Sequence, residues 1–286
     1  MNNILKTILY LSGLTLLLLA LGQFLGGSQG MFVAFVFAVL INFLAFGWSD
    51  KIVLWIYRAE PLSEDAAPEV FAILRELCEP VNFPKPHVYL IPSLSPNAFA
   101  TGSSPRRAAI VLTQGAIETL NREELKGVLA HELAHVENRD TLLATFASAL
   151  AGFLSLLASG VKWMFWVGSP RDSKGESKNP IVFLARALFL SLAALLIRLA
   201  IFRSREYEAD RRGAEWCGDP LYLASALFKL EAGLKQFPMR QAEPSAAHLF
   251  VISPLQGKLA VLFKTHPPLE ERIARLEEMA RRIGKG

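Results

Sequence analysis

Long apolar runs alternate with mixed hydrophobic and polar segments along the 286-residue chain. A helix of about 20 mostly apolar residues is long enough to span a bilayer. Four runs reach about that length: Ile8–Leu25, Met31–Trp48, Thr141–Gly160 and Ile181–Phe202. We interpret 1–50 and 141–202 as two transmembrane helical hairpins, and the first run as a retained anchor. For the second pair of runs, a buried core hairpin of the soluble part is the alternative.

Basic residues near the ends of these runs predict the orientation of the chain. Lys6, Lys51 and Arg58 flank the first hairpin on its open side, and a group of arginines beginning at Arg203 follows the second hairpin. Cytoplasmic flanks of membrane spans carry an excess of lysine and arginine. Both termini and the soluble parts are therefore expected in the cytoplasm, although the loop between the third and fourth runs is also basic.

The mixed segments 51–140 and 203–286 are expected to form the soluble parts. In the first of them, Pro68–Glu79 has apolar residues at helical spacing, and KPHVYLIP, NAFATG and RAAIVLT have the length and composition of short strands. Asn121 is a helix-capping residue type, and the two glutamates after it favour a helix start. The expected fold class is mainly α with a small antiparallel sheet, beside the two transmembrane hairpins.

Charge and cysteine content narrow the classes of function. The net charge is +4 and no basic cluster stands out, so a nucleic-acid partner is not expected. Cys78 and Cys217 lie far apart and have no metal-type spacing, which favours a reducing compartment.

The segment VLAHELAHVENRD places two histidines four residues apart on the helix expected after Asn121. Residues i and i+4 share a helix face, so His131 and His135 can direct their imidazoles at one metal ion. Glu132 would lie beside the open position of that ion, where it could take a proton from an attacking water. An ordinary helix with two solvated histidines is the alternative, but the apolar neighbours favour a buried site.

A catalytic zinc site needs a third protein ligand. The extended histidine motif requires glycine at 138 and histidine at 141, whereas this chain has Asn138 and Thr141. The later segment SREYEADRRGAEW offers Glu206 as the ligand, with Asp210 one turn away to accept the N–H of a ligand histidine. Glu208 falls on the other side of that helix and is expected at the surface. A charged helix face paired with nearby arginines is the alternative.

These motifs together resemble a known family. HELAH, followed downstream by EYEAD across a hydrophobic hairpin, is similar to the HtpX membrane metalloproteases, relatives of the CAAX prenyl-proteases. PNAFATG, SREYEADRRGA and THPPLEERIARL also match that pattern, so the resemblance covers nearly the whole chain. It implies a zincin-like (gluzincin) metalloprotease domain with one zinc ion held by His131, His135 and Glu206, and with Glu132 as catalytic base. It also implies endopeptidase activity in the bacterial inner membrane, with a role in membrane-protein quality control and stress response.

Two further sites are predicted beside the zinc. Asn97, Ala98 and Phe99 would form an edge strand that pairs with substrate backbone by strand addition, with the Asn97 side chain bonding the substrate main chain. A simple turn residue is the alternative for Asn97. His266 could donate a hydrogen bond to the oxyanion of the reaction. A cap on the helix that follows it is the alternative.

The expected substrates are membrane proteins or unfolded polypeptides, because the motif helix ends at about Asp140, beside the third apolar run. The lipid bilayer is the other expected partner, and no oligomeric state and no role for 233–264 are predicted. Three other functions are the alternatives. A prenyl-protease would usually have more spans, an inactive zinc-binding scaffold or chaperone would tolerate loss of Glu132, and a transporter would need more polar groups within its spans.

Overall fold

The computed structural model describes residues 3–142, 144, 148, 203–239, 242–243, 246–255 and 266–284. Most of the second predicted hairpin, 141–202, lies outside the described residues. In chain order, the described elements are α1 (Asn3–Ile56), β1 (Glu60–Pro61), α2 (Pro68–Cys78), β2 (His87–Ile91), β3 (Ala98–Thr101), β4 (Ala109–Thr113), α3 (Gln114–Thr119), α4 (Arg122–Glu137), α7 (Arg203–Cys217), α8 (Pro220–Gln236), the short 3-10 helix η3 (Ala247–Leu249) and α10 (Leu269–Arg282).

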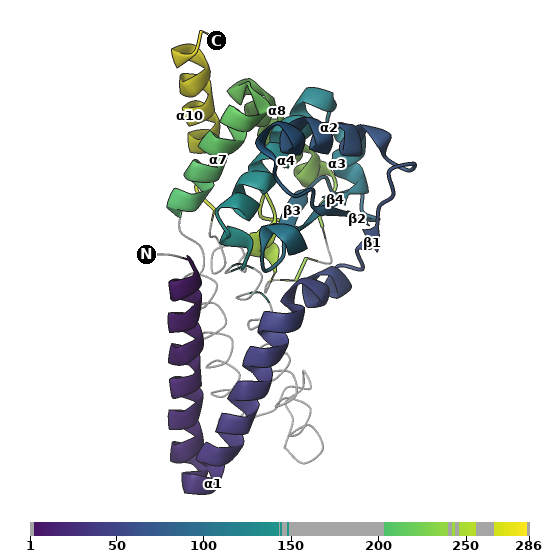
Figure 1. The fold of residues 1–286 in the computed structure, drawn as a ribbon. Coiled ribbons are helices and arrows are strands. Elements are labelled where there is room, and N and C mark those ends of the chain that lie inside the picture. The colour runs from purple at the N-terminus through teal and green to yellow at the C-terminus, as the bar shows by residue number, and fades with distance from the viewer. Residues whose placement is uncertain are drawn as a thin grey trace, which may run out of the picture.

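The N-terminal helical segment α1 reverses direction along its length, so that its two arms lie beside each other below the mixed domain (Figure 1). Gly27 within it has a backbone φ of +58°, a left-handed conformation that glycine adopts without steric cost. The helical structure continues to Ile56, past the predicted hairpin boundary at 50. By length and hydropathy together, none of the described helices is suited to crossing a membrane. The transmembrane character of the first hairpin therefore stays a prediction.

The four strands form one mixed sheet in the order β1-β2-β4-β3. The prediction of an antiparallel sheet was wrong, because β2 and β4 run parallel, with Val88 opposite Ile110. The other two pairings, β1 with β2 and β3 with β4, are antiparallel. The chain leaves β2, forms β3 at the far edge, and returns through β4 between them, so strands adjacent in sequence are not all neighbours in space. Strand β3 is consequently an edge strand, as predicted.

Helix α4 is capped at its start and packed closely along its buried face. Asn121 and Glu124 form a reciprocal capping box at its start, which confirms the predicted helix origin. A Cβ built on Gly127 would come 2.7 Å from the backbone nitrogen of Leu223 in α8. A Cβ built on Gly213 in α7 would come 2.8 Å from the Cα of His131. Because these two glycines have no side chains, the backbones of α7 and α8 can pack directly against the backbone of α4.

A second, smaller core cluster joins β3 to distant parts of the chain. The ring of Phe99 lies 4.8 Å from that of Phe250 and 5.9 Å from that of Tyr57, measured between centroids. Phe99 and Phe250 are fully buried. Aromatic pairs at these separations contribute packing energy beyond the burial of their area. Through this cluster, the segment that contains η3 is fixed beside the edge strand.

Candidate metal centre

Helix α4 contributes three polar side chains to one buried position. His131 and Glu132 are buried, at 1% and 2% exposure, in a helix whose other buried residues are mostly apolar. The rings of His131 and His135 lie 4.7 Å apart between centroids and nearly perpendicular, at 89°. The i, i+4 spacing therefore brings both imidazoles to one place, as expected from the sequence.

Helix α7 brings the predicted third ligand to the same position. Oε1 of Glu206 lies 3.6 Å from Nε2 of His135. One ligand atom from each of His131, His135 and Glu206 can be chosen so that all three lie within 4.8 Å of one another. Glu208 is exposed and pairs with Arg211 on the protein surface, where the sequence placed it. The arrangement thus separates two glutamates that are only two positions apart in the chain.

The chemistry of these three residues fits a zinc ion. Two imidazole nitrogens and one carboxylate oxygen, with room for a further ligand, form the donor set of catalytic zinc sites. Among the described residues, Oε2 of Glu206 is buried and has no hydrogen-bond partner, although Arg272 and His266 lie at ion-pair distance from it. A buried charged oxygen that lacks a hydrogen bond is costly, and a bound cation would offset that cost.

Each ligand histidine has a carboxylate beside its Nδ1 atom. Asp210 Oδ1 lies 3.1 Å from Nδ1 of His131, at ion-pair distance but without the alignment of a hydrogen bond. Asp140 Oδ2 lies 3.4 Å from Nδ1 of His135. Carboxylates in this position fix the histidine tautomer that leaves Nε2 available to a metal. Asp210 was predicted in this role, whereas the contact from Asp140 was not.

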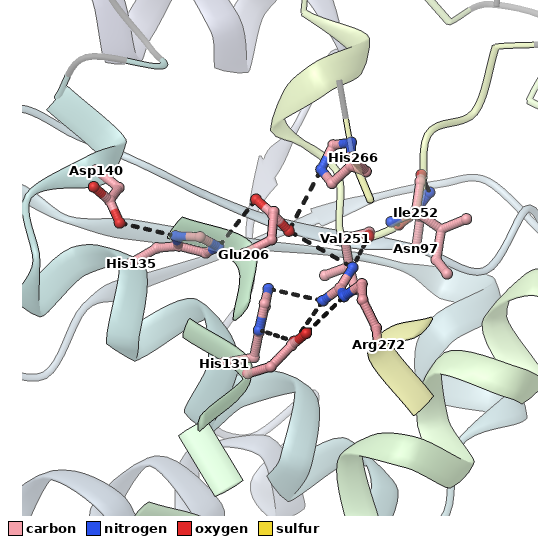
Figure 2. A network of polar contacts seen from close by, with 10 residues as sticks. Asn97, His131, His135, Asp140, Glu206, Val251, Ile252, His266 and Arg272 are labelled. Atoms are coloured by element: carbon pink, nitrogen blue, oxygen red, sulfur yellow. Dashed lines mark hydrogen bonds and ion pairs between the residues drawn. The ribbon is translucent and has the colours of Figure 1, made fainter. Parts of the chain in front are cut away.

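A buried arginine from α10 connects the members of the centre (Figure 2). Arg272 is 1% exposed, and it donates to both oxygens of Asp210, from Nε at 2.8 Å and from Nη2 at 2.7 Å. Its Nη1 donates to the carbonyl of Val251 at 3.0 Å and lies 3.6 Å from Oε2 of Glu206. The guanidinium thereby offsets the negative charge of two buried carboxylates.

Sequence reasoning missed Arg272, although one signal was present. The buried residues of α10 are Arg272, Leu276 and Ala280, which recur every fourth position along one stripe. An arginine on the apolar stripe of an amphipathic helix must find a buried partner, because an unpaired buried charge is unstable.

His266 lies beside the three candidate ligands, with Nε2 3.8 Å from Oε2 of Glu206. The predicted oxyanion donor is therefore close to the position where a metal would bind. The structure does not test that role.

The three predicted substrate-binding residues have other partners in the structure. The side chain of Asn97 donates to the carbonyl of Ile252 at 2.7 Å and accepts from the Ile252 amide at 3.3 Å. The carbonyl of Ala98 accepts from the amide of Val251 at 2.9 Å. Phe99 points into the core cluster with Phe250. The chain's own segment thus pairs with the first part of the β3 edge, and a substrate contact from Asn97 stays a prediction.

Burial and neighbouring charges shift the pKa values at the centre. Burial raises the pKa of Glu132 to about 7, with a contribution from Glu206 and opposition from His135. Burial also acts to raise the pKa of Glu206, but electrostatic interactions with His266, His135 and Arg272 outweigh it and lower that pKa to about 2. Burial alone would lower the pKa of His135, yet the hydrogen bond that its Nδ1–H donates to Asp140 and the charges of the nearby glutamates raise it to about 9. Glu132 is therefore the carboxylate suited to proton transfer near neutral pH.

Glu132, His135 and Glu206 line one cavity. Its wall also includes two residues of η3 that no sequence motif indicated. The lining residues are Ala100, Glu132, His135, Asp140, Thr141, Ala144, Arg205, Glu206, His248 and Leu249. The cavity therefore joins the edge strand, the motif helix, the start of α7 and η3.

Comparison with known proteins finds a peptidase family and relatives that match this chain over most of its length. The family model described as Peptidase family M48 matches residues 64–280. A relative called Protease HtpX homolog, from Syntrophobacter fumaroxidans, is 48% identical over 282 residues, which cover 98% of this chain and 100% of the relative. A protein of the same name from Pyrococcus furiosus is 43% identical over 280 residues, or 98% of this chain and 96% of the relative. Among solved structures, the crystal structure of S. mikatae Ste24p aligns with a TM-score of 0.48 at 19% identity, covering 95% of this chain and 64% of that chain.

Proposed function

Because the chain belongs to peptidase family M48, we propose that it is a zinc-dependent endopeptidase that cleaves membrane proteins or unfolded polypeptides at the cytoplasmic face of the membrane. The observation that carries this proposal is the convergence of His131, His135 and Glu206 around one point, with Glu132 in the same cavity. The two helices that supply these residues meet at the backbone contact of Gly213, which favours a fixed geometry.

Each residue then has a defined part in peptide hydrolysis. A zinc ion in this site would polarise the scissile carbonyl and lower the pKa of a water molecule to about 7. Glu132 takes the proton of the attacking water and returns it to the leaving amine, for which its pKa of about 7 is suited. His266, whose pKa is lowered by burial, donates an N–H to the developing oxyanion. Asp210 and Asp140 hold the two ligand histidines in orientation.

The membrane part of the proposal rests on α1. Large apolar side chains on its surface are at least half exposed at several positions, among them Leu16, Phe32, Val36, Leu40 and Trp55. Large apolar side chains exposed along a helix are typical of contact with a membrane or another protein. The motif helix ends at Glu137, close before the third apolar run of the sequence. Catalysis near the lipid surface would favour substrates that emerge from the bilayer.

The decisive experiment compares Glu132→Gln with the wild-type protein in detergent, each loaded with zinc after chelator treatment. We expect wild-type cleavage of an unfolded polypeptide and of a membrane protein, and a loss of about 10²- to 10⁴-fold in the variant. Zinc content, measured in parallel, should stay at one ion per chain in both proteins. Glu123→Gln is the matched control, because Glu123 is an exposed glutamate in the first turn of the same helix.

Three outcomes separate the possibilities. Zinc binding by both proteins, with cleavage by neither, would favour an inactive scaffold and overturn the peptidase proposal. Equal cleavage by wild type and Glu132→Gln would remove the base from its role. Equal rates on soluble and membrane substrates would contradict the membrane preference alone.

A further inference from the structure

The segment around η3 received no role from the sequence, yet it reaches the candidate active site. Ala247, His248 and Leu249 are buried, and the last two line the cavity that also contains Glu132 and His135. Phe250 anchors the segment in the aromatic cluster beside β3. A second histidine side chain of the cavity wall is thus held on a fixed support.

The hydrogen bonds of His248 determine its tautomer. Its Nε2 atom lies 3.2 Å from the carbonyl oxygen of Ala144 and 3.2 Å from Oγ of Ser148. The Ser148 hydroxyl itself donates to the same carbonyl at 3.0 Å. Because a carbonyl oxygen only accepts hydrogen bonds, Nε2 must carry the proton. In a neutral imidazole the other nitrogen, Nδ1, is then an acceptor.

That acceptor has no partner in the part of the chain that the structure describes. Nδ1 of His248 is buried there without a hydrogen bond, and the residue as a whole is 5% exposed. Burial lowers the pKa of His248 to about 4, against the effect of its bond to Ala144, so the ring is neutral at physiological pH. Buried polar atoms are almost always paired, and an exception at a functional cavity calls for a partner that arrives from outside.

A peptide substrate can supply that partner. Ala100, in the edge strand β3, lines the same cavity as His248. An extended peptide presents its N–H and C=O groups alternately on two sides. Pairing of one side with the β3 edge leaves the N–H groups of the other side unpaired in the cavity, where each must find an acceptor or lose binding energy.

We propose that His248 accepts, through Nδ1, a hydrogen bond from a backbone N–H of the bound substrate, and so positions the peptide at the candidate active site. This inference rests on the proposed peptidase function. It gives the η3 segment a substrate-binding role, and it assigns recognition to the peptide backbone rather than to a particular side chain.

Two substitutions by amide side chains test the roles of the two ring nitrogens of His248 separately. His248→Gln keeps a donor near the Nε2 position and removes the Nδ1 acceptor, whereas His248→Asn keeps an oxygen acceptor near the Nδ1 position and removes the Nε2 donor. Both proteins are loaded with zinc before the assay. In His248→Gln we expect a KM about 3- to 10-fold higher than in the wild-type protein, with little change in kcat, as for loss of one hydrogen bond. His248→Asn should have a KM closer to wild type but a lower melting temperature. A merely structural histidine would show the reverse order of KM values.

A second measurement does not depend on turnover. Binding of a peptide series is measured on zinc-loaded Glu132→Gln protein, with and without His248→Gln, and each peptide has one backbone amide replaced by an ester. An ester removes the N–H at a single position. We expect one ester to weaken binding about 3- to 10-fold in the His248 protein and to have no effect in His248→Gln. Equal sensitivity of both proteins at every position would overturn the inference.

The two proposals fail in different ways. Position-specific loss of binding without any zinc-dependent cleavage would retain the role of His248 and remove the peptidase function. Normal cleavage with an unchanged KM in His248→Gln would retain the peptidase and remove the role of His248.

Discussion

The candidate centre has two halves that differ in how their residues come together. In α4, His131, Glu132 and His135 lie within one short motif on one helix. The other half is assembled over long separations: Arg272 meets Asp210 across 62 positions and approaches His131 across 141. The α4 half supplies two of the candidate ligands and the candidate base, while the distant half supplies the third candidate ligand, charge balance and walls. Reactive groups can therefore be set by local spacing, whereas their environment depends on the complete fold.

The sharpest way to break this comparison is to remove the buried arginine. Arg272→Met leaves two buried carboxylates without their cation, and removal of one partner of a buried ion pair costs about 3–5 kcal/mol. We expect a loss of that size in the free energy of unfolding, measured by denaturant titration of the detergent-solubilised protein. Arg275→Met is the matched control, because Arg275 lies one turn away and half exposed, and its pair with Glu271 is a surface pair. Equal losses in the two variants would contradict the charge-balancing role.

The pKa of Glu132 gives a pH-dependent test of the α4 half. Between the ordinary value of 4.5 and about 7, the folded protein holds a proton on Glu132 that the unfolded chain has released. Stability must then fall as pH rises through this range. With zinc removed by chelator, Glu132→Gln should match wild type near pH 4.5 and exceed it at pH 8 by roughly 3 kcal/mol, at about 1.4 kcal/mol per unit of pKa. If the difference in the free energy of unfolding between the two proteins stayed constant across this pH range, the pKa of Glu132 would not be raised in the folded protein.

Two asparagines allow the same comparison between local and long-range contacts, with smaller expected losses of stability. Asn121→Ala removes a local helix cap and should cost about 1 kcal/mol. Asn97→Ala leaves both backbone groups of Ile252 without their side-chain partner, and should cost about 2 kcal/mol, since unpaired buried groups cost about 1–3 kcal/mol. Melting temperatures of both variants give the order. A larger effect at Asn121 would mean that the long-range contact is weak.

The sequence predicted those features that depend on short spacing. The helix cap at Asn121, the shared face of the two histidines and the edge position of β3 all follow from nearby residues. The parallel pairing of β2 with β4 could not be predicted in this way, because β3 lies between these two strands in the sequence. Strand order depends on where the intervening chain passes, and no local pattern in the segment between β2 and β3 specifies it.

The long-range half of the site was harder to predict for the same reason. Glu206 was found because a zinc site requires a third ligand, so the chemistry limited the search. No such requirement indicated Asp140 or His248. Arg272 did leave a trace, as a charge on an apolar stripe, but its partner 62 positions away could be identified only from the fold.

The late position of Arg272 in the chain also bears on how the protein is made. Synthesis proceeds from the N-terminus, and parts of a chain begin to fold while it is still growing. His131 and His135, and the buried carboxylates of Glu206 and Asp210, are therefore translated before the cation that offsets the negative charge. Until α10 docks, the carboxylates of Glu206 and Asp210 repel each other and the ligand geometry is not held. Under the proposed function, cutting activity would therefore arise only late in biogenesis, which would protect the nascent chain and its neighbours on the ribosome from premature hydrolysis.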